Sequence, residues 1–211
     1  SVSFEIKTYN VNPSIAYRVN ETVSLGLGIN WQYVDATYKR QAGISAVPGL
    51  ASAATVVASP VKLTLDDDAW GWNVGALFTV SPSTKVGVSY RSTMQYHTTG
   101  KIKVSGPSSN FNNATTSDAK ADIKMPDTAI MSVTQKLSDK WEMLGDVSWT
   151  GWSSIPKVDI YRSSNTALNV GPSSRNGALT QVLDSDFQDT WRVALGANYQ
   201  YNDAWKLKFG L

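Results

Sequence analysis

The sequence has no cysteine, a single histidine and few charged residues. Only 17% of its 211 residues are charged, the formal net charge is +2, and no run is rich in lysine and arginine. Such a chain is not expected to bind nucleic acid, which selects strongly basic surfaces. The sequence also shows no cluster of residues at metal-ligand spacing and no phosphate-binding glycine loop. We therefore expect neither a metal site nor a cofactor.

Long hydrophobic runs are absent as well. No stretch approaches the roughly 18 consecutive apolar residues of a transmembrane helix, and the mean hydropathy is -0.22. Strands that cross a membrane are not excluded, because they alternate apolar and polar residues and average to mild hydrophilicity. What the sequence does contain is eight tryptophans and nine tyrosines, side chains favoured where an apolar surface meets water.

Alternation of apolar and polar residues dominates the chain. The two alternating sets of side chains lie on opposite faces of an extended strand. Eight segments share this pattern, near residues 9–19, 22–33, 70–80, 85–97, 123–137, 141–150, 187–201 and 205–211. In the fourth segment the pattern places Met94 and Tyr96 on the apolar face and His97 on the polar face. The alternation predicts an all-β protein with little or no helix.

The connections between these segments alternate between short and long. Short turns built from turn-forming residues are expected at Asn20-Glu21, Pro82-Ser83, Ser138-Asp139 and Asn202-Asp203. Long loops are expected at about 40–65, 105–120 and 162–185. Antiparallel strands with short turns at one end and long loops at the other are typical of an outer-membrane barrel. A soluble β-sandwich is the alternative, but its strands are usually about five or six residues long.

Six motifs occur in order along the expected strands. They are Asn12-Pro13-Ser14-Ile15-Ala16-Tyr17-Arg18, Gly71-Trp72-Asn73-Val74-Gly75, Ser89-Tyr90-Arg91-Ser92, Met125-Pro126-Asp127, Ser148-Trp149-Thr150-Gly151-Trp152-Ser153, and the stretch from Phe187 to Leu211. Together they resemble the central barrel strands of the FadL-type long-chain fatty-acid transporters of the Gram-negative outer membrane. The resemblance covers nearly every expected strand and none of the long loops.

The resemblance implies an antiparallel transmembrane β-barrel of fourteen strands, plugged by an N-terminal hatch, that admits hydrophobic substrates from outside. Residues 1–211 would form a partial barrel domain of about eight strands, and the hatch and terminal strands would be absent from this chain. The expected location is the outer membrane. There the protein would be a monomer in contact with outer-membrane lipid and lipopolysaccharide.

A fatty acid requires an apolar groove for its tail and a cation or donors for its carboxylate. By alternation, five cations face the lumen and are candidate ligands: Arg18, Arg91, Arg192, Lys206 and Lys208. Pairing with the lumenal carboxylates of Asp146 and Glu142 is the more common role of such cations. Three apolar side chains are also placed inside, where they would contact the plug or line an apolar pocket: Leu77, Leu144 and Trp152.

The loop around residues 43–60 is unusually apolar for an exposed segment. Its apolar residues are Ile44, Val47, Leu50, Val56 and Val57. An exposed apolar patch often marks a binding surface. The loop is therefore either a surface capture site for the substrate, a cover over the barrel mouth, or both.

An enzymatic site is not expected. His97 has no carboxylate or serine beside it in the sequence that would suggest a hydrolase. The run Asp66-Asp67-Asp68 could bind calcium or cations that bridge lipopolysaccharide, but the end of a solvated loop is the simpler interpretation.

The sequence therefore predicts passive uptake of hydrophobic compounds, with long-chain fatty acids as the leading substrate. One alternative is a channel of the same fold for aromatic or alkane hydrocarbons, which need the same apolar pocket but no cation. The others are a non-specific porin for hydrophilic solutes and a structural or adhesive barrel without a saturable ligand.

Overall fold

The computed structural model describes residues 2–44, 57–105, 116–155, 157–164, 177–184 and 187–211. These residues form one antiparallel sheet of 13 strand segments. The predicted all-β, antiparallel architecture is thereby confirmed. The first seven segments are β1 (Ser3–Val11), β2 (Ser14–Arg18), β3 (Val23–Ile44), β4 (Val57–Ser81), β5 (Thr84–Arg91), β6 (Met94–Val104) and β7 (Ser117–Met125). The others are β8 (Thr128–Lys136), β9 (Trp141–Thr150), β10 (Lys157–Arg162), β11 (Leu179–Asp184), β12 (Thr190–Gln200) and β13 (Lys206–Gly210), with the 3₁₀ turn η1 (Trp152–Ser154) after β9. Among the described residues, no helix is long and apolar enough to cross a membrane.

Most of the segments are halves of interrupted strands. β1 and β2 both pair with β3, and β5 and β6 both pair with β4. In the same way β7 and β8, β9 and β10, and β11 and β12 continue one another across short breaks. These five interrupted strands together with β3, β4 and β13 make eight strands in the described part of the chain, which agrees with the eight segments predicted. The sheet is open there, because β1 and β2 pair only with β3, and β13 only with β12.

The short turns fall at the four predicted positions, and in three of them one side chain accepts hydrogen bonds from two backbone N–H groups. Asn20 Oδ1 accepts hydrogen bonds from the backbone N–H groups of Thr22 and Val23, both at 2.8 Å. Asn202 and Ser138 make the same pair of bonds to the residues two and three positions later. Such local bonds to the backbone are the physical reason that Asn and Ser favour turns.

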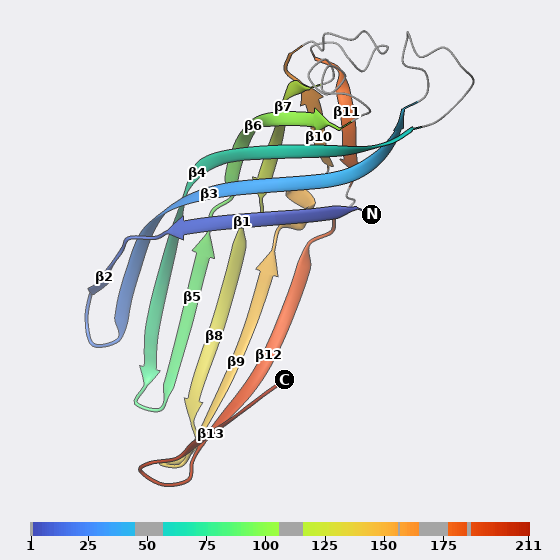
Figure 1. Cartoon of the computed structure of the whole chain (residues 1–211). Helices are drawn as coiled ribbons and strands as arrows, with labels where there is room; N and C mark the ends of the chain where they lie inside the picture. Colours follow the sequence, from blue (N-terminus) through green and yellow to red (C-terminus); the bar gives the residue numbers. More distant parts are fainter. Residues whose placement is uncertain (1, 45–56, 106–115, 156, 165–176, 185–186) are drawn as a thin grey trace, which may run out of the picture.

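The sheet has two sections, which Figure 1 shows one above the other. The lower section consists of β2, β5, β8, β9, β12, β13 and the adjoining ends of β3 and β4, and it carries the short turns. The upper section consists of β1, β6, β7, β10, β11 and the far ends of β3 and β4. Only β3 and β4 run unbroken through both sections, and in Figure 1 they bend from the lower section across the upper one.

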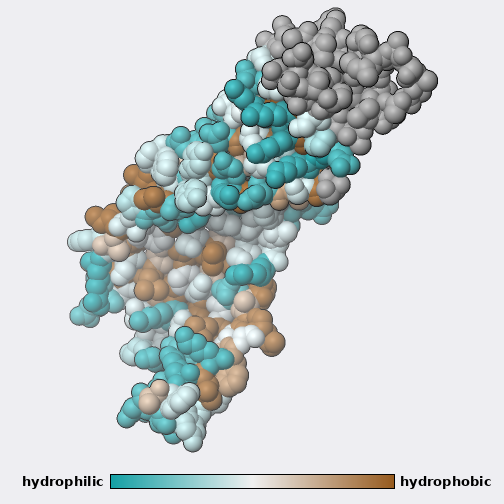
Figure 2. Space-filling view, in the orientation of Figure 1, coloured by the Kyte–Doolittle hydropathy of each residue, from teal (hydrophilic) through white to brown (hydrophobic). Residues whose placement is uncertain are grey.

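The two faces of the lower section differ in polarity. Leu27 and Ile29 of β3 are 53% and 51% exposed, whereas their neighbours Gly28 and Asn30 are buried on the opposite face. We call the face with the exposed apolar side chains the outer face and the other the inner face. The outer face continues across the sheet with Val74, Met131, Val147, Val193 and Leu195, all of them exposed. In Figure 2, hydrophobic side chains accordingly gather along the lower strands, and hydrophilic ones dominate the upper section.

Aromatic side chains border this apolar band. Tyr90, Trp149 and Trp191 occupy one row across β5, β9 and β12 near the top of the lower section. Near its lower end, the rings of Trp141 and Tyr199 lie 4.6 Å apart. Aromatic girdles on both sides of an exposed apolar band are characteristic of strands that cross a membrane. The lower section therefore has the surface of a transmembrane barrel wall.

The strands extend further than the sequence analysis predicts. The loop predicted at 40–65 is wrong at both ends, because β3 continues to Ile44 and β4 begins at Val57, paired residue by residue. β7 begins inside the loop predicted at 105–120, and β11 lies inside the one predicted at 162–185. These extensions pair with one another in the upper section. Their backbone groups are thus satisfied by partners that are distant in sequence.

Candidate functional site

Five strands break at the same height of the sheet. The breaks are residues 12–13, 92–93, 126–127, 151–156 and 185–189. Backbone hydrogen bonds link the first two across β3 and β4, since Ile29 N donates to Pro13 O at 3.0 Å and Ser92 N donates to Trp72 O at 2.9 Å, while Ile29 and Trp72 are paired. Three of the breaks contain proline, which has no N–H to donate to a ladder. We call this row of breaks the interruption line; it separates the lower section from the upper one.

The interruption line changes which residues face inward. In β5 the odd-numbered Arg91 is on the inner face, paired with Asn73. In β6 the even-numbered Met94 and Tyr96 are on that face, only 4% and 0% exposed. The predicted placement of Met94 and Tyr96 on the outer face, and of His97 in the lumen, is therefore wrong. Residues 92–93 leave the extended ladder, so the alternation cannot be counted through them.

Above the interruption line the inner face is apolar. Its side chains pack into one buried group, the apolar cluster, in which every member is at most 7% exposed: Leu63, Leu65, Ile102, Val104, Ala119, Ala121 and Ile160. The residues between them in sequence point outward and are mostly charged or polar, among them Lys62, Lys103, Lys120 and Asp122. This polarity is the reverse of that in the lower section. The upper section thus presents a hydrophilic surface to its surroundings and a hydrophobic one to the interior.

A second buried group continues the apolar inner face down to the interruption line. It consists of Val34, Ala69, Met94 and Tyr96, with Ile123 and Met125 packed against them. The hydroxyl of Tyr96 donates to Met94 Sδ at 3.9 Å. Burial, with a smaller effect of the nearby Asp67 carboxylate, raises the pKa of Tyr96 to about 12. The phenol is therefore neutral at physiological pH and adds no charge to this apolar surface.

At the interruption line itself the inner face becomes polar. Asn30 is fully buried, and its Nδ2 donates to Asn73 Oδ1 at 3.3 Å. Asn30 Oδ1 has no hydrogen-bond partner among the described residues. Gly28 leaves room for these side chains, because a Cβ here would displace the side-chain oxygens of Asn73 and Asn12. These amides form a polar step between the apolar upper interior and the lumen of the lower section.

The strand register places the predicted lumenal cations on the inner face, namely Arg18, Arg91, Arg192, Lys206 and Lys208. Arg192 Nη2 lies 3.4 Å from Asp146 Oδ1, and Lys206 Nζ lies 3.8 Å from Glu142 Oε2. The expectation that Asp146 and Glu142 pair with lumenal cations is confirmed for these two contacts. The Lys206–Glu142 pair joins β13 to the lower end of β9, whereas the Arg192–Asp146 pair joins the upper part of β12 to the middle of β9. Neither pair includes a residue of the apolar cluster.

The remaining three cations differ in their surroundings. Arg18 Nε donates to the carbonyl oxygen of Asn20 at 3.3 Å and thereby supports the first turn. No carboxylate of the described residues lies within ion-pair distance of Arg91 or Lys208. Arg91 is the one of the three that adjoins the interruption line. Contact of any of these side chains with a ligand stays a prediction.

The predicted apolar site residues are divided between three locations. Leu77 and Leu144 are on the inner face of the lower section, in register with Gly87 and Gly196. Trp152 lies in η1, where its ring centroid is 5.5 Å from that of Phe187. Of the five apolar residues in the predicted capture loop, Ile44 and Val57 pair with each other at the ends of β3 and β4. The other three, Val47, Leu50 and Val56, lie outside the described residues, so the capture site stays a prediction.

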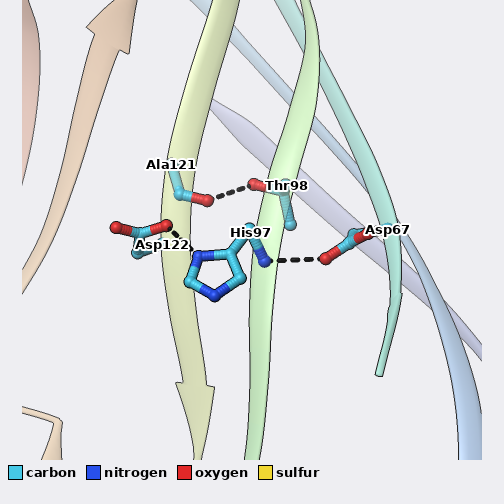
Figure 3. Close-up of polar contacts among 5 residues, drawn as sticks. All are labelled: Asp67, His97, Thr98, Ala121 and Asp122. Carbon is cyan, nitrogen blue, oxygen red and sulfur yellow. Dashed lines mark hydrogen bonds and ion pairs between the residues drawn. The ribbon is translucent and has the colours of Figure 1, made fainter. Parts of the chain in front are cut away.

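His97 has a carboxylate neighbour that its sequence context did not reveal. Pairing of β6 with β7 brings Asp122 Oδ1 to 2.8 Å from His97 Nδ1, and the backbone N–H of His97 donates to Asp67 Oδ2 at 2.7 Å (Figure 3). The imidazole and the Asp122 carboxylate are 70% and 78% exposed on the outer face. Their contact is therefore an exposed hydrogen bond on the outer face, on the side of the sheet opposite the apolar cluster.

The aspartate run does not form a loop end, because it lies inside β4. Consecutive side chains of a strand point to opposite faces, so the three carboxylates are separated. Asp67 accepts from the His97 backbone, and Asp68 Oδ2 accepts from Trp31 Nε1 at 2.8 Å. Within the described part of the chain, no group of three or more His, Cys, Asp or Glu residues is arranged to hold a metal ion.

Arg162 is an inner-face cation that the sequence analysis left in a loop. It pairs with Ala119 of the apolar cluster, and its Nη1 donates to Ser117 Oγ. Burial lowers the pKa of its guanidinium. The alternation of Val158, Ile160 and their charged neighbours could have identified β10, but the strand is short and the preceding break obscures it. The apolar inner face thus has a guanidinium at one border.

Comparison with known proteins places this arrangement among outer-membrane transporters. Residues 1–211 match the family described as "Outer membrane protein transport protein (OMPP1/FadL/TodX)". The chain is 26% identical to a long-chain fatty acid transport protein of Escherichia coli O6:H1, over 98% of this chain and 49% of that protein. It therefore spans about half the length of this relative.

Two solved structures share the fold at lower identity. A FadL homologue of Pseudomonas aeruginosa superposes with a TM-score of 0.79 at 17% identity, covering 98% of this chain and 49% of that one. The toluene transporter TbuX of Ralstonia pickettii superposes with a TM-score of 0.74 at 18% identity, covering 98% and 55%. Both similarities concern the arrangement of the strands.

Proposed function

The chain belongs to the OMPP1/FadL/TodX family of outer membrane transport proteins, and on this premise we propose that its parent protein takes up hydrophobic compounds, chiefly long-chain fatty acids, by passive diffusion. The protein is located in the outer membrane of a Gram-negative bacterium, as its relatives are. In this proposal residues 1–211 are part of the barrel wall, and the rest of the parent protein supplies the remaining wall and the plug. Transport moves an unchanged molecule, so no covalent chemistry is required.

The observation that carries the proposal is the reversal of polarity at the interruption line. Below the line the apolar side chains face lipid, and above it they face inward, where Leu63, Leu65 and Ile102 are almost completely buried. A porin for hydrophilic solutes needs a polar interior along its whole length. An apolar interior behind a hydrophilic exterior instead supports a path for hydrophobic molecules, whose transfer from water to an apolar surface is favourable.

Cations near this surface favour fatty acids over hydrocarbons. Arg162 borders the apolar cluster through Ala119, and Arg91 adjoins the polar step at Asn73. A guanidinium binds a carboxylate through charge-assisted hydrogen bonds, whereas toluene or an alkane offers no acceptor. The alternative, hydrocarbon uptake, is supported by the similarity to the fold of TbuX and by the apolar character of the cluster itself.

The proposal is tested by equilibrium binding of oleate to the full-length parent protein in detergent, with toluene as competitor. Leu65→Asn places an amide in the apolar cluster, and Thr64→Asn places the same group on the outer face one residue away. Arg91→Ala, Arg18→Ala and Arg192→Ala test the lumenal cations. Retention of heat-resistant mobility on gels establishes that each variant is folded.

We expect saturable oleate binding that Leu65→Asn weakens about tenfold, because an alkyl chain that covers the amide cannot hydrogen-bond to it, which costs about 1–3 kcal/mol. Thr64→Asn should leave oleate binding unchanged. Arg91→Ala should weaken oleate binding without affecting toluene. Displacement of oleate by toluene with no effect of any arginine would favour hydrocarbon uptake. Absence of saturable binding, together with a large conductance for hydrophilic solutes, would replace the proposal by a porin.

A further inference from the structure

Three lysines stand side by side on the outer face of the upper section. Lys39 of β3 is paired with Lys62 of β4, and Lys62 is paired with Lys103 of β6. All three side chains are exposed. Neighbouring strands are about 4.8 Å apart, so the three ammonium groups form a row roughly 10 Å long. We call these three residues the lysine row.

Like charges directly opposite one another destabilise a sheet. No carboxylate of the described residues lies within ion-pair distance of a lysine in the row; Glu5, on the neighbouring strand, is paired with Lys7 at 3.1 Å. The sequence segments 45–56 and 106–115, which follow β3 and β6, contain no charged residue at all. The repulsion in the row is therefore not balanced by the nearby sequence.

Elsewhere on the same face, lysines alternate with acids. Lys157 Nζ lies 3.2 Å from Asp159 Oδ2, and Asp122 separates Lys120 from Lys124 along β7. The outer face is thus neutralised locally in one region and left positive in the other. This contrast between two regions of one surface indicates that the lysine row has an external anion as its partner.

We propose that the lysine row binds phosphate groups of the saccharide core of the glycolipid in the outer leaflet. The row lies in the upper section, beyond the aromatic border, because Lys39 and Lys62 are eight residues past the paired Trp31 and Trp70 along β3 and β4. The aromatic border marks the level of the lipid headgroups. An outward-facing side chain beyond it meets the saccharide of lipopolysaccharide rather than the acyl chains. Phosphorylated sugars present closely spaced anions that match a row of ammonium groups.

The test measures binding of purified lipopolysaccharide to the full-length parent protein in neutral detergent, with EDTA present to remove bridging divalent cations. One arm uses lipopolysaccharide with phosphorylated heptoses, and the other uses a deep-rough form that ends before the heptoses but keeps the phosphates of the lipid anchor. The row variant is K39Q/K62Q/K103Q. The control variant K120Q/K124Q/K157Q removes the same charge from the same face.

Each lysine near an anionic membrane surface contributes about fivefold in affinity, so the row variant should bind the heptose-phosphorylated form on the order of 100-fold more weakly. The control variant should lose much less affinity for that form. The deep-rough form should bind the wild type and the row variant with equal affinity. In low salt without lipopolysaccharide, Lys62→Gln should raise the melting temperature, because it relieves the repulsion. Equal losses in the row and control variants would overturn the proposal, as would a loss confined to the deep-rough form or no loss at all.

Discussion

The Nδ1 atom of His97 lies 2.8 Å from Oδ1 of Asp122, across the pairing of β6 with β7. Both side chains are largely exposed, so water and salt screen the pair and its net contribution is small. Asp67 contacts the same histidine differently, because its carboxylate accepts the backbone N–H at 2.7 Å. This second contact fixes the backbone where the pairing of β4 with β6 ends at Asp66 and Thr99.

The two contacts should therefore differ in their effect on stability. Asp122→Asn is expected to change the free energy of unfolding by less than about 0.5 kcal/mol, whereas Asp67→Ala should lower it by about 1 kcal/mol. Denaturant unfolding of the full-length parent protein, followed by tryptophan fluorescence, measures both. A larger loss for Asp122→Asn than for Asp67→Ala would contradict this assignment.

At Gly100 the backbone of β4 lies close against β6. A Cβ at this position would collide with the backbone carbonyl of Thr64, and a carbonyl within a ladder cannot move aside cheaply. Gly100→Ala is expected to lower the free energy of unfolding by about 1–3 kcal/mol. Gly87→Ala is the control, because its Cβ would meet only Leu77 Cδ1 at 3.8 Å. Similar melting temperatures for the two variants would show that the close approach is not rigid.

Tyr96 should make the upper section sensitive to alkaline pH. Its pKa is raised to about 12 in the folded protein, against about 10 in an unfolded chain. Folding therefore favours the neutral phenol, and this stabilisation is complete below pH ~10 and is lost as the pH rises through the folded pKa. Tyr96→Phe should flatten the decline in stability between about pH 10 and 12, as measured by denaturant unfolding. Tyr201→Phe, a change at an exposed tyrosine, is the control and should leave the decline unchanged. If Tyr96→Phe loses stability as steeply as the wild type over this pH range, the decline does not come from Tyr96.

Asp189 holds the break before β12 against β9. Its Oδ2 accepts from Trp149 Nε1 at 3.2 Å and its Oδ1 accepts from Ser153 N at 2.9 Å. Asp189→Ala is expected to lower the free energy of unfolding by about 1–2 kcal/mol, because it removes both acceptors. Asp189→Asn keeps one acceptor oxygen and should lose less. Gln188→Ala, a change at the neighbouring exposed residue, serves as the control; an equal loss there would mean that the two bonds contribute little.

Much of the fold could be predicted from the sequence, because its information is local. Alternation identified eight strands, and the turn residues Asn20, Ser138 and Asn202 fixed the short connections through bonds to their own backbone. The same alternation placed Arg192 and Lys206 on the inner face beside Asp146 and Glu142. These features depend on residues a few positions apart, or on the register that the short turns impose.

The features of the upper section could not be predicted in this way. Counting alternate residues through 92–93 reversed the inner and outer faces of β6, and Tyr96 was consequently placed on the wrong side. A break in the ladder resets the alternation, and nothing in the two residues themselves states by how much. The strand ends at Ile44 and Val57 were likewise missed, because a small apolar sequence resembles a loop until its pairing partner is known.

The sequence by itself determined that this chain is a set of antiparallel strands with one lipid-compatible face, since each side chain's face follows from its position in a strand. Only the tertiary structure decided which strands lie next to one another. This order of strands groups Leu65 with Ile102 and Ala119 on the inner face. It also places Lys62 between Lys39 and Lys103 on the outer face. These residues are separated by long stretches of chain, so their contacts depend on the register of the assembled sheet. The candidate sites arise from that register, which no local pattern encodes.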